Sequence, residues 1–331
     1  LIISADHEIF GNGSGDVMHC MVNPTNKLKV IADKFGAKIT LFTDVCEYWV
    51  FEKKQPELAK SIKNQWIDFI KSNHDVQLHL HPQWLNYSFN NNNYELDYNL
   101  WRLPSVKSDN NDFGYGVKEL IFNGKQTLES VLQKENKSYK SYAFRAGGWC
   151  IQPFDHIREA LFKVGVRKDS SVFPGAHFEA GEYSFDFRKA PDKDEYRFNS
   201  DVCVEEPGDF AEFPISSKRY SPLFYWRLYI LGRLNPTDHK MLGNGNFIPQ
   251  PGRKKSVLTG FTWNHVSCDG YYTSVLDSTL VQMERRGRNN IVIIGHPKSF
   301  TRYSLKKMDE FMRLNHEKHQ FVTFSEQNEN N

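Results

Sequence analysis

The sequence predicts an α/β fold built on a parallel sheet that is either open or closed into a barrel. Short apolar runs with strand character alternate with amphipathic stretches along the chain, and unusual polar residues gather where the apolar runs end. Such alternation is typical of parallel sheets, because each parallel connection needs a crossover segment. The 331 residues show no internal repeat and no long linker, so we expect one domain over residues 1–331.

The expected strands are short runs rich in Val, Ile, Leu and Phe, as buried parallel strands usually are. In chain order they are Leu1–Ala5, Lys38–Thr43, Val76–Leu80, Ser141–Arg145, Gly165–Lys168, Glu212–Ser216, Val257–Trp263, Ile291–Gly295 and Gln320–Phe324.

Apolar residues at helical spacing predict helices between these strands. In Glu57–Lys71 the apolar side chains form one stripe, and Pro56 suits the first turn. The other expected helices are Thr25–Lys34, Val117–Gln133, Pro153–Lys163, Thr273–Arg285 and Ser304–Asn315. Three insertions interrupt the alternation, at 86–112, 182–204 and 217–255.

Composition limits the classes of partner. The formal net charge is +2 with charges spread along the chain, which argues against a nucleic-acid-binding protein. The five cysteines form no C-x-x-C pair, which favours a reducing, cytoplasmic location. No apolar run has transmembrane length and no signal peptide is visible. Secretion stays open, because residue 1 is not Met and already lies in an expected strand.

Two short motifs point to a metal site. Asp6-His7-Glu8 follows the first expected strand, and His79-Leu80-His81 follows the third. Residues i and i+2 of a strand point to the same side, so Asp6 can lie beside Glu8, and His79 beside His81. Carboxylates and imidazoles that meet at one place can bind a divalent metal.

Other polar clusters fall at the same ends of the expected strands, where α/β folds carry their functional residues. A single His or Arg there is more often a capping residue or a surface ion pair, but a random scatter would fill both ends of the sheet. These clusters are Arg145-Ala146-Gly147-Gly148-Trp149, Asp169-Ser170-Ser171, Trp263-Asn264-His265 and His296-Pro297.

The order of these motifs resembles the polysaccharide deacetylases of carbohydrate esterase family 4, the NodB-homology group, and more narrowly the WalW-like deacetylases. The resemblance runs from Leu1 to about Phe324. It departs from the family in two places: the adjacent acid pair is replaced by Asp6-His7-Glu8, and the two histidines are spaced i, i+2 rather than i, i+4.

The resemblance implies a distorted (β/α) barrel of seven or eight strands that removes N- or O-acetyl groups from a surface polysaccharide or its precursor. It also implies Zn²⁺ or a similar ion as cofactor, and an acetylated carbohydrate as the partner. The implied roles are metal binding by Glu8, His79 and His81 with His7 as an alternative, catalysis by Asp6, Arg145 and His296, and substrate binding by Gly148, Trp149, Asp169 and Trp263.

Two other functions remain open from the sequence. The altered motifs fit a non-catalytic carbohydrate-binding protein that kept the fold. A glycoside hydrolase is the second alternative, with Asp6 and either Glu212 or Glu8 as its two carboxyl groups. Nothing in the sequence indicates an oligomeric state.

Overall fold

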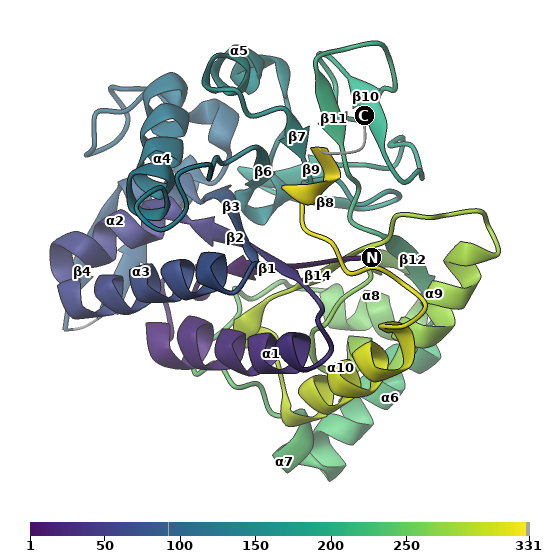
Figure 1. Cartoon of the computed structure of the whole chain (residues 1–331). Helices are drawn as coiled ribbons and strands as arrows, with labels where there is room; N and C mark the ends of the chain where they lie inside the picture. Colours follow the sequence, from purple (N-terminus) through teal and green to yellow (C-terminus); the bar gives the residue numbers. More distant parts are fainter. Residues whose placement is uncertain (92, 329–331) are drawn as a thin grey trace.

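A curled sheet of eight strands forms the centre of the molecule in the computed structural model, which describes residues 1–91 and 93–328 (Figure 1). In spatial order the strands are β10 (Tyr196–Phe198), β11 (Phe210–Glu212), β7 (Lys168–Asp169), β6 (Ala143–Ala146), β3 (Asp75–Leu80), β2 (Ile39–Asp44), β1 (Ile2–His7) and β14 (Val292–Gly295). The neighbours from β11 to β14 pair in parallel, and β10 pairs with β11 antiparallel.

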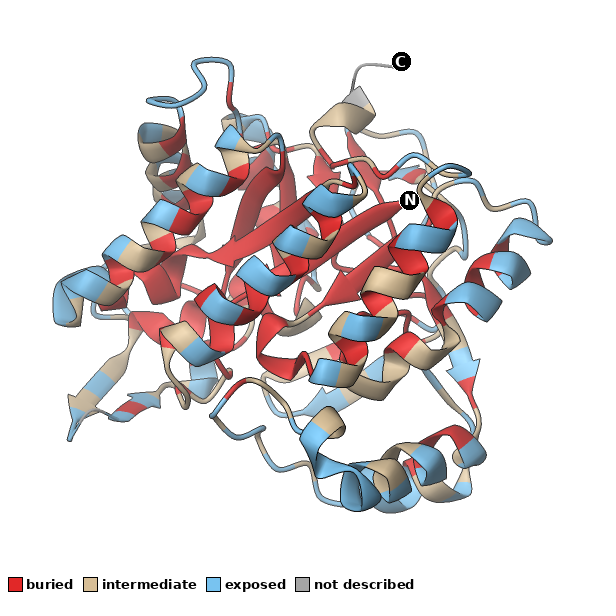
Figure 2. Ribbon diagram, turned by 60° about the horizontal axis from the view of Figure 1, so that its bottom comes forward, coloured by how far each residue is buried: buried red, intermediate tan, exposed pale blue. Residues whose placement is uncertain are grey.

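Strands β1, β2 and β3 are buried along their whole length. Apolar residues on both faces explain this, because the β-helix-β crossovers place helices against each side of a parallel sheet. In Figure 2 the sheet is almost entirely buried, and the helices over it turn exposed residues outward. The polar residues within these three strands are therefore desolvated and need partners.

Ten α-helices connect and cover the strands within the described part of the chain. They are α1 (Asn23–Lys34), α2 (Val45–Lys54), α3 (Pro56–Lys71), α4 (Val117–Leu132), α5 (Asp155–Val164), α6 (Pro222–Leu234), α7 (Pro236–His239), α8 (Arg253–Thr259), α9 (Leu276–Glu284) and α10 (Arg302–Asn315). Helix α1 packs beside α10, and α3 beside α2. No helix in the described ranges has the length and apolar character needed to cross a bilayer.

The three predicted insertions carry small elements outside the large sheet. The first holds a hairpin of β4 (Tyr87–Asn90) and β5 (Asn93–Leu96). The second overlaps a hairpin of β8 (His177–Ala180) and β9 (Tyr183–Asp186). The third contains β12 (Ser217–Tyr220), which pairs with β13 (Thr262–His265) and encloses α6, α7 and α8. Asn92 of the first insertion and residues 329–331 of the predicted domain lie outside the described residues.

Two of the expected strands are wrong, and two more, Gly165–Lys168 and Glu212–Ser216, each share only one residue with the observed strands β7 and β11. Gln320–Phe324 forms no strand, and its apolar residues contribute to the core without a ladder of hydrogen bonds. Val257–Trp263 is divided between the end of α8 and the start of β13. An apolar run indicates that a segment is buried, but burial alone does not distinguish a strand from a helix or a packed loop.

A closed barrel is not present in the described residues. The sheet has edge strands at β10 and β14, and beyond β14 only isolated bridges join Ile215 to Val292 and Ser267 to Ile294. The sequence prediction of an α/β fold is correct, and the finer prediction of a barrel is replaced by a curled sheet of eight strands.

Candidate active site

The predicted polar clusters converge because their strands are neighbours. Strands β6, β3, β2, β1 and β14 lie side by side in parallel, so their carboxyl ends share one edge of the sheet. Asp6 and His7 end β1, while His81 follows β3 and His296 follows β14. Chain segments that are far apart in sequence therefore supply side chains to one place.

Glu8, His79 and His81 form the metal-binding geometry that the sequence predicts. One ligand atom from each residue lies within 4.8 Å of the others, and all three side chains are buried. The Nε2 atom of His79 is 3.4 Å from Glu8 Oε2, and His81 Nε2 contacts the same oxygen. Neither contact has hydrogen-bond geometry, so two buried nitrogens face one carboxylate oxygen without a standard partner.

The ring of His79 is oriented by the neighbouring strand. Its Nδ1 lies 2.7 Å from the carbonyl oxygen of Arg145 in β6. A carbonyl only accepts, so Nδ1 carries the hydrogen and the Nε2 lone pair is available to a metal.

Gln83 contacts the corresponding nitrogen of His81, with its amide in the orientation that donates to the ring. Its amide group lies 2.9 Å from His81 Nδ1 through Nε2, while its Oε1 is buried without a partner. Rotating the amide by 180° would place Oε1 against Nδ1, so that the ring donates there and frees Nε2. The donor set and the orphaned Oε1 together fit a metal ion held by Glu8, His79 and His81.

Lys298 contacts the other oxygen of Glu8. Its Nζ donates to Glu8 Oε1 at 2.6 Å and to the carbonyl of Ile9 at 2.7 Å. Burial opposes ionisation of Glu8, but the contacts with His81 and the ammonium group of Lys298 hold the pKa of its carboxyl well below the usual range. Glu8 is thereby an anion whose Oε2 is directed at the two histidines.

Asp6 is paired with a fully buried arginine. Arg145 donates from Nη1 to Asp6 Oδ1 at 2.6 Å, and its remaining donors reach Ser4 Oγ and both oxygens of Ser170. Burial opposes ionisation of Asp6, yet the charges of Arg145 and the nearby histidines lower the pKa of this carboxyl below its ordinary value. Asp6 is therefore a fixed anion with Oδ2 free of the arginine.

His296 lies between two carboxylates. Its Nδ1 is 2.7 Å from Asp269 Oδ2, and its Nε2 is 3.6 Å from Asp6 Oδ2. Burial lowers the pKa of His296, but the charges of Asp269 and Asp6 outweigh burial and raise it above the usual value. The ring is thus favoured as a proton carrier that can act as an acid through Nε2.

His7 does not reach the cluster. Alternation along β1 turns its side chain to the opposite face, where Nδ1 lies 3.1 Å from Thr43 Oγ1 and Nε2 lies 2.7 Å from Gln65 Oε1. Burial lowers the pKa of this imidazole to about 4, so it is a neutral group between the sheet and α3. The alternative ligand suggested by the motif is wrong for this geometry, because residues i and i+1 of a strand face opposite sides.

Gly148 and Trp149 lie near the acid–base residues. The Trp149 ring packs 6.0 Å from the ring of His296 and 5.5 Å from that of His265. Gly148 has φ = +57°, and a Cβ there would lie 2.5 Å from Trp101 Nε1. The glycine thus permits the approach of a tryptophan from another segment of this chain.

Asp169 and Trp263 lie in different surroundings. Asp169 is buried, and its oxygens accept hydrogen bonds from the backbone N–H and the hydroxyl of Ser171. Trp263 is 45% exposed on β13 and packs its ring against Gly175. Their predicted contact with substrate stays a prediction, and for Asp169 the carboxylate is already engaged within the fold.

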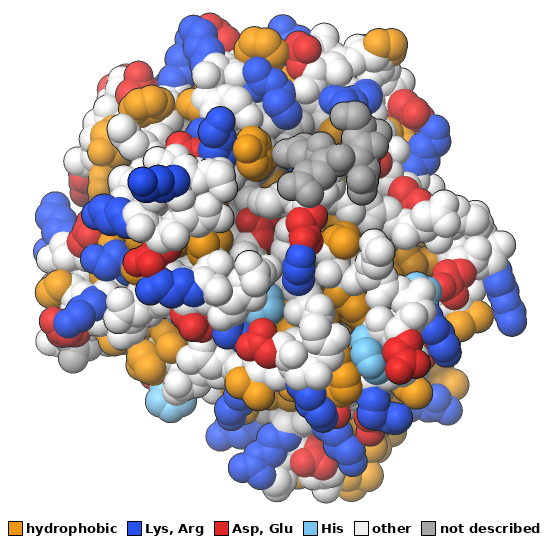
Figure 3. Space-filling view, viewed as in Figure 1, with side chains coloured by type: hydrophobic (Ala, Val, Ile, Leu, Met, Phe, Trp, Pro, Cys, Tyr) orange, Lys and Arg blue, Asp and Glu red, His pale blue; other side chains and the backbone are white. Residues whose placement is uncertain are grey.

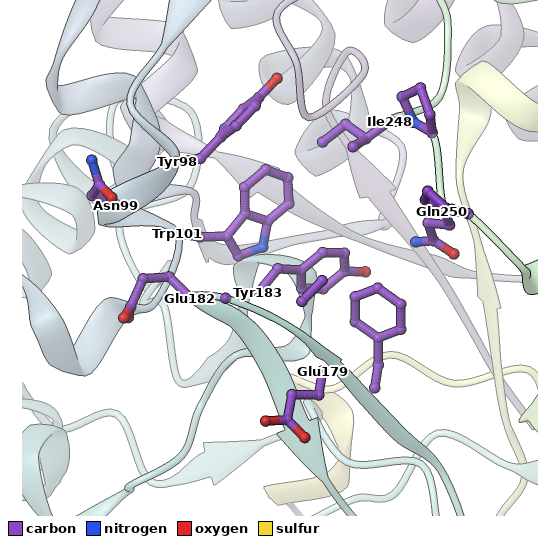
Figure 4. A pocket seen from close by; sticks show the side chains of 13 residues that line it. Tyr98, Asn99, Trp101, Glu179, Glu182, Tyr183, Ile248 and Gln250 are labelled. Carbon is purple, nitrogen blue, oxygen red and sulfur yellow. The ribbon is translucent and has the colours of Figure 1, made fainter.

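An aromatic cavity of about 450 Å³ adjoins the histidine cluster. Trp101 and Tyr183 stack in its wall (Figure 4). Their ring centroids are 4.8 Å apart, and the Trp101 ring lies 6.2 Å from that of His81. The remaining wall includes Tyr98, Phe178 and Pro249. Flat aromatic faces next to a polar centre are well suited to a cyclic ligand with both apolar and polar surfaces.

Sequence reasoning missed four side chains that complete the site: Gln83, Trp101, Asp269 and Lys298. Gln83 and Lys298 each lie two residues beyond a predicted histidine, a spacing that could have drawn attention to them. Asp269 follows the Ser267–Ile294 bridge, which no local pattern reveals. Trp101 lies in the first predicted insertion, and only tertiary packing brings it to His81.

No protein-family model and no curated protein matches the chain. Among solved structures it is similar to a candidate polysaccharide deacetylase from Mycobacterium smegmatis, with TM-score 0.49, 13% identity, and coverage of 98% of this chain and 88% of that one. A 4-alpha-glucanotransferase from Thermococcus litoralis has TM-score 0.48 and 12% identity, covering 98% and 37%. Peptidoglycan deacetylase PdaC from Bacillus subtilis has TM-score 0.35 and 10% identity, covering 98% and 87%.

Proposed function

We propose that this chain is a metal-dependent hydrolase that removes acetyl groups from a carbohydrate, as the NodB-type and WalW-like resemblance implies. The observation that carries the proposal is the convergence of Glu8, His79 and His81 beside two separately paired groups, Asp6 and His296. Because each set has its own partners, one edge of the sheet offers a metal site, a base and an acid.

The ligand set favours zinc. Two imidazoles and one carboxylate are typical of catalytic zinc sites, which keep a further position for water or substrate. A divalent ion bound there supplies a Lewis acid that polarises the acetyl carbonyl and lowers the pKa of water. Lys298 is a positioning residue, since its contact with Glu8 Oε1 leaves Oε2 directed at the histidines.

Asp6 and His296 carry the proton transfers of the proposed reaction. Asp6 accepts the proton of the attacking water at Oδ2, because Arg145 already occupies Oδ1. His296 donates from Nε2 to the leaving nitrogen or oxygen, while Asp269 holds Nδ1 and sets the orientation of the ring. Arg145 keeps Asp6 ionised and aligned, which makes it a positioning residue.

The aromatic cavity supports a carbohydrate as the substrate. Its apolar rings can stack on the face of a sugar. An acetylated sugar residue at the metal site with its neighbour in this cavity would occupy both parts of the site.

The glycoside hydrolase alternative has weaker support. It requires two carboxyl groups that face a shared sugar cleft. Glu212 is fully buried beside Asp169 and accepts a hydrogen bond from the backbone N–H of Val172, while Glu8 is held by Lys298 and faces the histidines. Neither residue forms with Asp6 the open pair that this reaction needs.

Metal analysis of a double variant tests the proposal directly. We expect His79→Ala with His81→Ala to lose stoichiometric zinc and all acetate release from an acetylated glycan, because two of the three ligands are gone. His7→Ala is the matched control, since His7 is equally buried but faces away from the cluster. Chelation should abolish activity of the wild type and zinc should restore it. Equal zinc in the double variant and the wild type would disprove the site.

Gln83 offers a finer test of the same centre. We expect Gln83→Leu to lower zinc affinity ~10–100-fold, the usual loss when a partner that orients a metal-binding histidine is removed. Gln83→Glu keeps an oxygen for His81 Nδ1 and should retain most of the affinity. Isothermal titration calorimetry measures the zinc affinity of both variants. An unchanged affinity in Gln83→Leu would show that Gln83 does not orient His81 for metal binding.

A further inference from the structure

Helix α6 (Pro222–Leu234) is apolar on two opposite faces. One face packs into a small core with β12, α8 and Tyr272, through Phe224 and Tyr225. The other face is exposed and carries Leu223, Trp226, Ile230 and Leu234, which we call the α6 stripe. Their spacing of three and four residues places them in one line along the helix. Leu234 is 77% exposed and Leu223 is 58% exposed.

An exposed stripe of this kind needs an explanation. A helix that is hydrophobic all round is normally buried or lies in a membrane, and contiguous exposed apolar patches mark interaction sites. Helix α6 is 13 residues long, which is too short to span a bilayer. In Figure 1, α6 and α7 lie at the lower edge of the molecule, away from the central sheet.

Positive charge is concentrated around the α6 stripe. Residues 217–263 contain eight Lys or Arg and one Asp, a net charge of +7, whereas the whole chain has +2 and its remainder therefore has −5. Figure 3 shows Lys and Arg side chains gathered at the same lower edge as α6 and α7. Seven of the eight cations are exposed: Arg219, Arg227, Arg233, Lys240, Arg253, Lys254 and Lys255.

These exposed cations have no acidic partners. None of the seven forms an ion pair with a carboxylate within the described ranges. Arg227 and Arg233 flank the α6 stripe on its two sides, at the angles that helical spacing sets. Charge that is segregated in this way and left unpaired is available to an anionic surface.

We propose that α6 and the basic residues around it dock this protein onto the surface of an anionic lipid bilayer. The α6 stripe would enter the boundary between headgroups and acyl chains, and the cations would contact the lipid phosphates. A second copy of the chain is a poor occupant, because a two-fold contact would place seven cations against the same seven. The proposal stands independently of the activity proposed above.

The docking unit is joined to the candidate active site. Tyr272 packs against α6 residues of the small core and also accepts a hydrogen bond from Asn264 at 3.0 Å. The next residue, His265, lies 6.0 Å from the ring of His296. Docking through α6 would therefore hold the active site close to the bilayer, where glycans attached to lipids are presented.

Co-sedimentation with vesicles tests the docking surface. We expect the wild type to bind vesicles of phosphatidylcholine and phosphatidylglycerol at low salt, to bind phosphatidylcholine vesicles weakly, and to be released by high salt. Arg227→Gln with Arg233→Gln should lower partitioning ~25-fold, since each cation near an anionic surface contributes ~1 kcal/mol. Ile230→Gln with Leu234→Gln should lower it at least ~10-fold, because each buried CH₂ contributes ~0.8 kcal/mol.

Matched controls lie on other elements of the chain. Lys137→Gln with Lys140→Gln removes two exposed cations, and Phe122→Ser removes a ring that is 52% exposed on α4. Both controls should bind as the wild type does. The proposal is overturned if the wild type binds neither kind of vesicle, or if the Ile230/Leu234 variant still binds fully, which would show a general polyanion site. Concentration-dependent dimerisation abolished by that variant would instead identify a second copy as the occupant.

Discussion

Two pairs of buried carboxyl groups differ in charge although both belong to the same sheet. Asp6 lies in β1 and Glu8 directly follows it. Both are buried beside Arg145, Lys298 and three histidines, and the pKa of each carboxyl is lowered. Asp169 on β7 and Glu212 on β11 are buried beside each other, and the pKa of each is raised by burial and, for Glu212, by the charge of Asp169.

The difference shows what makes a buried carboxyl group useful for chemistry. Burial alone favours the neutral form, and for Asp6 and Glu8 a cation within contact distance reverses this preference. Asp6 has such a cation at 2.6 Å, whereas Glu212 has an acid as its neighbour. The first pair is therefore poised to bind a metal and accept protons, and the second is suited to share a proton inside the fold.

The largest expected effect comes from removing charge at the first pair. We expect Asp6→Asn to lower acetate release ~10²–10⁴-fold, the usual size of a general-base contribution. Asp169→Asn is the matched control, because it removes a buried carboxylate of the same sheet that faces no metal ligand. Steady-state rates and zinc content measure both variants. If both variants lost acetate release to a similar extent, the first carboxyl pair would have no catalytic role that the second lacks.

Breaking the ion pair of Asp6 should be the next largest effect. Arg145→Met leaves a buried carboxylate uncompensated, so we expect the free energy of unfolding at neutral pH to fall by ~3–5 kcal/mol. The native-state pKa of Asp6 is lowered, so the pair stabilises the fold above the unfolded-state pKa, and this contribution is lost as pH falls through the native value. The variant should thus differ less from the wild type in acid.

The control for this variant is the surface pair Arg188–Asp186, in which both side chains are largely exposed. Arg188→Met should cost far less than Arg145→Met, because solvent screens exposed ion pairs. Urea unfolding at neutral and acidic pH measures both. A loss at Arg145 no greater than that at Arg188 would contradict the assigned role of the buried cation.

The smallest effect should appear at the second pair, as a change in pH dependence. The native-state pKa of Glu212 is raised, so the native state binds more protons than the unfolded state between the two values. Stability is therefore greatest below the unfolded-state pKa and falls as pH rises toward the native value. We expect Glu212→Gln to reduce this fall, because the group that takes up the extra proton is gone.

Urea unfolding at one mildly acidic and one mildly alkaline pH checks this, since the contribution is lost as pH rises from the unfolded-state pKa toward the raised native value. The Glu212→Gln side chain has nearly the same shape and keeps an oxygen for the backbone N–H of Val172, so packing is preserved while the titrating proton is removed. If the wild type and the variant lose stability equally between the two pH values, the carboxyl pair does not hold an extra proton.

Much of the fold and part of the site followed from local sequence patterns. Apolar runs determined β1, β2, β3 and β14, because a buried parallel strand needs apolar residues on both faces. The i, i+2 spacing of His79 and His81 was enough to place both rings on one side. The same alternation turns the side chain of His7 to the face opposite Glu8, although the sequence motif had allowed His7 as an alternative metal ligand.

The tertiary structure decided which groups of the site are ionised and which side chains belong to it. Lys298 and Glu8 are separated by 290 positions in sequence, and Asp6 and Arg145 by 139. No local pattern encodes such contacts, because they arise from the order of strands in the sheet and from the bridges beyond β14. The sequence by itself determined which residues could take part in chemistry, and the packing of distant segments decided which of them are charged, oriented and brought together.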